Sequence, residues 1–180
     1  MIEKKCVHPI KVNRFINEFV NTVCELPEDT YFVIKSSTTN DMNFFVCGEI
    51  GEDEELEIIV PRWRTANYKG DIGGKLFRKD FVSKCAMAKG FSDVTISLLH
   101  EVGHKMTDKD IPTDYRRSTA LREISENCSD PYEVCARYFS LIDESLATNW
   151  AINWLSDPEN RKIAKDFEKK FFSCFTALAR

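Results

Sequence analysis

The residues in this sequence best suited to chemistry are two histidines and a glutamate in the segment His100-Glu101-Val102-Gly103-His104. Residues four apart on a helix lie on the same face, so the imidazoles of His100 and His104 would project toward one point. Two imidazoles placed in this way can bind one Zn²⁺ ion at about 2.0–2.1 Å. Glu101 would then be close enough to a water at that ion to take its proton as a general base. The motif therefore predicts a zinc site capable of hydrolytic chemistry.

Such a site needs a third protein ligand and keeps a fourth position open for water. The remaining histidine, His8, stands beside a proline in a polar segment, so we expect it on the surface. A carboxylate from a later helix fits better. Glu144 is the strongest candidate, because Ala147 and Ala151 share its helical face and would allow a close approach to another backbone. Glu123 is the main alternative. Two further glutamates also stay open: Glu126 and Glu133.

A longer pattern extends this motif. His100-Glu101-Val102-Gly103-His104 followed by Glu144-x-x-Ala147-x-x-Trp150-Ala151-x-x-Trp154-Leu155 resembles the ImmA/IrrE-type zinc metallopeptidases. These are small, usually intracellular bacterial proteins within the thermolysin-like gluzincins, and many are carried by phages and other mobile elements. The resemblance covers about residues 94–155 and implies a zincin-like fold. It also implies that His100, His104 and Glu144 bind zinc and that Glu101 is the catalytic base.

Two features of this sequence depart from the family pattern. Thr148 follows Ala147, where the family often has Asn or Asp. The interval between His104 and Glu144 is longer than usual, with room for an extra short helix around Ala120. The longer interval keeps Glu123 as an alternative ligand.

The resemblance implies a zinc-dependent peptidase that hydrolyses a peptide bond in an intracellular regulatory protein. The alternative is a zinc-binding regulatory or interaction module of phage or mobile-element origin without turnover, and a third hypothesis is an interaction protein with no metal. Glu101 favours catalysis, because a structural zinc site has no use for a base. Catalysis would also need a donor for the developing oxyanion. The chain between the two motifs offers four candidates: Tyr115, Arg116, Tyr132 and Tyr138.

The elements that must position these residues are predicted from apolar spacing and capping patterns. The fold class expected is α+β, with a small N-terminal antiparallel sheet packed on a mainly helical C-terminal half. The strand 56–60 is expected at an exposed sheet edge, where it could align an extended peptide by strand addition. Strands are expected at 31–34, 43–50 and 56–60, and helices at 12–23, 77–89, 92–105, 131–155 and from 158 to the end.

Composition indicates one ordinary globular domain over residues 1–180, a zincin-like metallopeptidase domain if the resemblance holds. Hydrophobic residues make up 43% of the sequence and charged residues 30%, which provides enough apolar surface for a core. Lys and Arg number 25 against 29 Asp and Glu, for a net charge of −4. This balance lacks the positive charge of a dedicated nucleic-acid binder, so we expect no nucleic-acid partner. The partner that the resemblance implies is a protein or peptide substrate.

The cysteines and the hydropathy pattern indicate where the protein works. Seven cysteines, an odd number, stand at irregular spacings, which is unlike the disulfide framework of a secreted protein. No apolar run approaches the length of a membrane-spanning helix. We therefore expect a cytoplasmic protein with reduced thiols and no membrane association.

Overall fold

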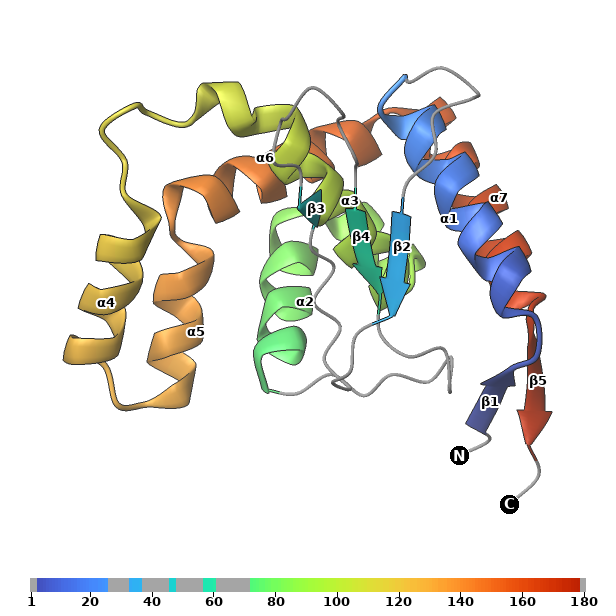
Figure 1. Cartoon of the computed structure of the whole chain (residues 1–180), viewed down its shortest axis with the longest axis horizontal. Helices are drawn as coiled ribbons and strands as arrows, with labels where there is room; N and C mark the ends of the chain where they lie inside the picture. The colour runs from blue at the N-terminus through green and yellow to red at the C-terminus, as the bar shows by residue number, and fades with distance from the viewer. Residues whose placement is uncertain (1–2, 26–32, 37–45, 48–56, 61–71, 179–180) are drawn as a thin grey trace. The chain divides into compact units, whose positions relative to one another are not determined.

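The computed structural model describes residues 3–25, 33–36, 46–47, 57–60 and 72–178 (Figure 1). The chain divides into two compact units. One unit combines Met1–Lys69 with Asp157–Arg180, and the other comprises Gly70–Ser156. Every residue predicted for the zinc site lies in the second unit. Within the described ranges, no helix is both long and apolar enough to cross a lipid bilayer.

In the first unit, two helices lie side by side (Figure 1). α1 (Pro9–Val23) confirms the predicted first helix, and α7 (Pro158–Phe172) begins after Asp157 as its capping pattern predicted. The Asp157 carboxylate accepts a hydrogen bond from the Glu159 amide at 2.7 Å. The helices pack through aromatic rings, with Phe19 stacked on Phe167 at a centroid distance of 4.4 Å.

The two ends of the chain pair as strands, which the apolar spacing did not predict. β1 (Glu3–Cys6) and β5 (Phe175–Leu178) form a two-stranded antiparallel sheet in which Cys6 lies opposite Phe175. The last helix was predicted to continue to the end of the chain, but it ends at Phe172. Hydrogen bonds from the Ser173 and Cys174 amides close its last turn. The strand that follows then has a partner at the other end of the sequence.

A three-stranded sheet in the first unit contains β2 (Val33–Ser36), β3 (Val46–Cys47) and β4 (Glu57–Val60), in the order β2-β4-β3. β3 and β4 pair antiparallel, as predicted, but β2 and β4 pair parallel. The prediction of a wholly antiparallel sheet is therefore wrong for one pair. The prediction of strand 56–60 at an edge is also wrong, because β4 lies between β2 and β3 in the described sheet.

The second unit is helical, and α3 (Asp93–Thr107) and α6 (Ile142–Ser156) make its most extensive contact. α2 (Ile72–Lys84) packs against α5 (Pro131–Phe139), and α4 (Arg117–Asn127) lies beside α5 (Figure 1). α4 is the extra helix predicted around Ala120. The remaining elements are two short 3₁₀ helices, η1 (Ala86–Gly90) and η2 (Asp108–Asp110). The mainly helical second half of the α+β prediction is confirmed.

The prediction of a single helix over 131–155 is wrong, because the helix is interrupted between α5 and α6. The start was predicted correctly: Asp130 accepts a hydrogen bond from the Glu133 amide at 3.1 Å. After Phe139 the amides of Ser140 and Leu141 turn back to carbonyls three residues earlier. A new helix then begins at Ile142. Glu144 consequently lies in a first helical turn, where the aligned peptide dipoles favour a carboxylate.

Candidate metal centre

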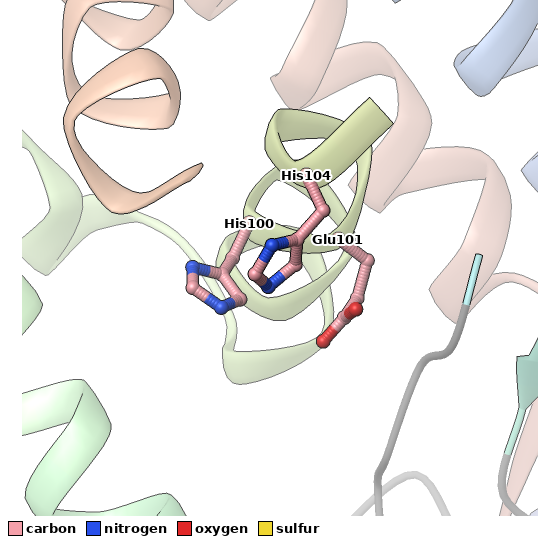
Figure 2. Close-up of side chains that lie close together, drawn as sticks. All are labelled: His100, Glu101 and His104. Atoms are coloured by element: carbon pink, nitrogen blue, oxygen red, sulfur yellow. The ribbon is translucent and has the colours of Figure 1, made fainter. Parts of the chain in front are cut away.

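α3 presents the two histidines of the motif on one face. Ser92 caps the helix by accepting a hydrogen bond from the Thr95 amide at 3.4 Å. The helix is then fixed by burial of the apolar side chains that precede the motif, with Leu98 and Leu99 fully inside. As a result, the rings of His100 and His104 lie next to each other with their centroids 4.7 Å apart (Figure 2). The prediction that these two rings lie side by side on one face of a helix is confirmed.

Glu144 reaches the same point from α6. Its Oε2 atom lies 3.0 Å from Nε2 of His100 and 3.6 Å from Nε2 of His104. The side chain is buried, with only 2% of the Glu144 surface exposed. Burial alone would raise the pKa of Glu144, but hydrogen bonds to His100 and His104 outweigh it and hold this pKa far below its usual range. Glu144 therefore faces the histidines as a carboxylate.

The other glutamates considered as ligands are elsewhere. Glu123 is exposed on α4. Glu126 is exposed on the same helix, where it faces Arg122, and Glu133 is exposed on α5, where it forms an ion pair with Arg137 at 2.8 Å. Of the candidates weighed from the sequence, the structure brings only Glu144 to the histidines. His8 is exposed at the start of α1 in the first unit, as expected.

A close approach of two backbones makes this meeting possible. A Cβ atom built on Gly103 would lie 2.4 Å from the carbonyl oxygen of Ala147 and 2.9 Å from its Cα atom. Ala147 and Ala151 are both fully buried, as their shared face with Glu144 predicted. Gly103 was missed as a structural residue. Glycine in a helix interior costs about 1 kcal/mol relative to alanine, so its presence at this position could have indicated a close contact with another backbone.

The surroundings of His100 fix its ring. Its Nδ1 atom lies 3.1 Å from the Thr148 hydroxyl, and the ring of Phe77 on α2 packs against it at 4.9 Å between centroids. Burial lowers the pKa of His100, against the opposing effect of the hydrogen bond to Glu144. In the structure Nε2 of His100 is hydrogen-bonded to Glu144; with an ion bound, a neutral imidazole whose Nδ1–H donates to Thr148 would offer the Nε2 lone pair to the metal instead. Thr148 thus supports the ring of His100 from α6.

Glu101 lies beside the histidines on the same helix (Figure 2). One ligand atom from each of His100, Glu101 and His104 can be chosen so that all lie within 4.8 Å of one another. Burial raises the pKa of the Glu101 carboxyl well above its usual range; the charge of Glu144 adds to the rise and Arg117 opposes it. Glu101 therefore holds a proton more readily than an ordinary surface glutamate does.

These donors fit a zinc ion by their chemistry. Two imidazole nitrogens and a carboxylate oxygen converge, which is the ligand type that Zn²⁺ takes in catalytic sites with three protein ligands. The three side chains form one site because Glu144 contacts both histidines. His100, His104 and Glu144 could hold the ion, and their assignment as metal ligands stays a prediction.

Arg117, at the start of α4, is a further residue of this site that the sequence analysis missed. Its Nη2 donates to Oε1 of Glu144 at 2.7 Å and to the Tyr138 hydroxyl at 2.8 Å, and its Nη1 forms an ion pair with Asp143. The sequence offered no signal for it, because α4 is a polar helix and an arginine there normally faces solvent.

The four candidate oxyanion donors are placed differently from one another. Tyr115 donates to Oδ1 of Asp143 at 2.7 Å, and Arg116 donates to backbone carbonyls of its own segment. Tyr132 is 58% exposed on α5. The Tyr138 hydroxyl lies at the site, where it accepts a hydrogen bond from Arg117. Burial raises the pKa of Tyr138, so this hydroxyl keeps its proton and remains able to donate it.

Comparisons with known proteins give no relative that would identify this site. Neither the protein-family models, nor the curated proteins, nor the solved structures include a match to this chain.

Proposed function

We propose that this chain is a zinc-dependent metallopeptidase of the ImmA/IrrE type with a zincin-like fold, acting on a peptide bond of an intracellular regulatory protein in the cytoplasm of a bacterium or phage-infected cell. The observation that carries the proposal is the meeting of Glu144 with both histidines of the motif, beside the carboxyl group of Glu101. The resemblance to the family, which rests on the same residues, supports the substrate class.

His100, His104 and Glu144 would hold the ion. A bound Zn²⁺ ion supplies a Lewis acid that polarises a carbonyl group and lowers the pKa of water toward about 7. Glu101 accepts the proton of the attacking water and passes it to the leaving amine. Its carboxyl group lies beside the two histidines, where a water at the ion would be held. Tyr138 is the candidate donor to the developing oxyanion.

The test uses the purified full chain loaded with zinc and incubated with a denatured protein and a peptide library, with the products identified by mass spectrometry. Glu101→Gln keeps the ligands and is expected to lower the cleavage rate by roughly 10²–10⁴-fold while the zinc content stays at one ion per chain. Glu126→Gln, on an exposed glutamate of α4, is the matched control and should cleave like the wild type. Cleavage that is equal in wild type and Glu101→Gln contradicts a peptidase.

The alternative, a zinc-binding regulatory module without turnover, predicts the opposite pattern in the same experiment. The zinc content would be normal in the wild type and lost in His100→Ala and Glu144→Ala, but no substrate would be cleaved faster than by Glu101→Gln. The position of Glu101 beside the histidines favours the peptidase, because a site that only binds metal would not need that carboxyl group.

A further inference from the structure

The two oxygen atoms of the Glu144 carboxylate have separate partners. Oε2 faces Nε2 of His100 at 3.0 Å and Nε2 of His104 at 3.6 Å. Oε1 accepts a hydrogen bond from Nη2 of Arg117 at 2.7 Å. The carboxylate therefore has one oxygen directed at the histidines and one held on the opposite side.

Arg117 is itself held in place by several contacts. Its Nη1 pairs with Oδ2 of Asp143, and its Nη2 also donates to the Tyr138 hydroxyl at 2.8 Å. The guanidinium lies over the Tyr138 ring, with its carbon 5.4 Å from the ring centroid. Asp143 is fixed in turn by Tyr115, whose hydroxyl donates to Oδ1 at 2.7 Å. A guanidinium with this many partners has little freedom to rotate.

The charges of the site require such a cation. Asp143 and Glu144 are consecutive residues, and both are buried in the first turn of α6. Two adjacent buried carboxylates repel each other and lose hydration, so they need a positive partner. Among the described residues, Arg117 is the arginine that pairs with both of them.

We propose that Arg117 is a positioning residue of the metal centre: it holds Oε1 of Glu144 so that only Oε2 is offered to the ion, and it offsets the paired charges of Asp143 and Glu144. This inference rests on the proposed zinc site. Loss of Arg117 has two opposing effects, because removing a cation strengthens the attraction for Zn²⁺ while releasing Glu144 loosens a ligand. The loosening dominates, since partners that orient metal ligands are typically worth 10–100-fold in metal affinity.

The test compares Arg117→Ala with Arg122→Ala by competition with a chromophoric zinc chelator. Arg122 is the matched control: it lies on the same helix, its side chain is 68% exposed, and its neighbour Glu126 is 3.8 Å away. Arg117→Ala is expected to bind zinc roughly 10–100-fold more weakly, and Arg122→Ala is expected to match the wild type.

A second measurement reports on the geometry of the ligands. The visible absorption bands of the Co²⁺-loaded protein are expected to change shape in Arg117→Ala at saturating Co²⁺ and to return toward the wild-type shape when methylguanidinium is added. Arg117→Lys keeps the charge but not the two-sided hydrogen bonding. If the alanine variant fails to fold, Arg117→Lys replaces it in the test. This variant should bind zinc with an affinity between those of wild type and Arg117→Ala, and its Co²⁺ absorption bands should be altered.

Two results would overturn the assignment of Arg117: wild-type affinity and bands in both Arg117 variants, or equal weakening in Arg117→Ala and Arg122→Ala. If the wild type binds neither Zn²⁺ nor Co²⁺, the proposed site and this inference fail together. If the wild type binds zinc and Arg117→Ala weakens it, but Glu101→Gln cleaves as the wild type does, the peptidase fails and the role of Arg117 stands.

Discussion

At the scale of single residues, Glu101 and Glu144 lie in the same site, but their surroundings shift their pKa values in opposite directions. Burial raises the pKa of Glu101 well above its usual range. Burial would do the same for Glu144, but its hydrogen bonds to the histidines lower this pKa instead. The two carboxyl groups therefore have different electrostatic surroundings although they lie in one site.

Thr148 provides the sharpest single-residue test of how the histidines are supported. Thr148→Val removes the hydroxyl that lies 3.1 Å from Nδ1 of His100 while keeping the shape of the side chain. The ring then loses the partner that fixes its tautomer and orientation. We expect the zinc affinity to fall roughly 10–100-fold, as measured by chelator competition.

Thr148→Ser is the matched control, because it keeps the hydroxyl and should bind zinc nearly as tightly as the wild type does. If valine and serine at this position give the same affinity, the contact between Thr148 and His100 does not support the metal site.

At the scale of elements, the contact between α3 and α6 brings the candidate metal ligands together. Gly103→Ala places a methyl group where Cβ would meet the Ala147 carbonyl oxygen at 2.4 Å. That atom belongs to a backbone, so the helices must move apart. Overpacking typically costs 1–3 kcal/mol, and the helix-propensity gain of alanine returns up to about 1 kcal/mol. We expect a net loss of unfolding free energy on the order of 1–2 kcal/mol, measured by urea denaturation, and weaker zinc binding.

Lys105→Ala is the control for this substitution, because Lys105 is exposed on the same helix and its replacement leaves the helix contact intact. If the Gly103→Ala protein is as stable as the wild type and its zinc affinity is unchanged, the contact between Gly103 and Ala147 does not limit how closely α3 and α6 approach each other.

The elements that could be predicted from sequence are those whose signals are local. Asp130 and Asp157 cap helices as predicted, because a side-chain acceptor followed by proline acts within one turn. The histidine pair followed from helical spacing in the same way. The break after Phe139 was missed because neither proline nor glycine marks it. Pairing of β1 with β5 and of β2 with β4 depends on contacts distant in sequence, as does the Arg117 contact with Glu144.

At the scale of the whole molecule, the two compact units differ in what they contribute to the candidate site. Residues 70–156 supply all of its candidate ligands, the proposed base and the Arg117 contacts. The first unit, made from both ends of the chain, contributes none of these residues. Metal binding should therefore act on stability through the helices of the second unit, where two distant segments of sequence would be joined by one ion.

Zinc should stabilise the protein through these ligands, because an ion that binds the folded state shifts the unfolding equilibrium by mass action. At free zinc about 100 times the dissociation constant, the gain is about 2.7 kcal/mol. For a chain of this size, that corresponds to a rise of roughly 5–10 °C in the unfolding temperature. Differential scanning fluorimetry with and without zinc measures this rise in the unfolding temperature.

Glu101→Gln should show the full rise, and Mg²⁺, which prefers oxygen ligands, should produce none in the wild type. Because the seven cysteines offer a competing set of soft ligands, the decisive control is the double variant His100→Ala/His104→Ala. A rise that persists in this variant would mean that the stabilising zinc binds elsewhere, whereas its disappearance would assign the stabilisation to the two imidazoles.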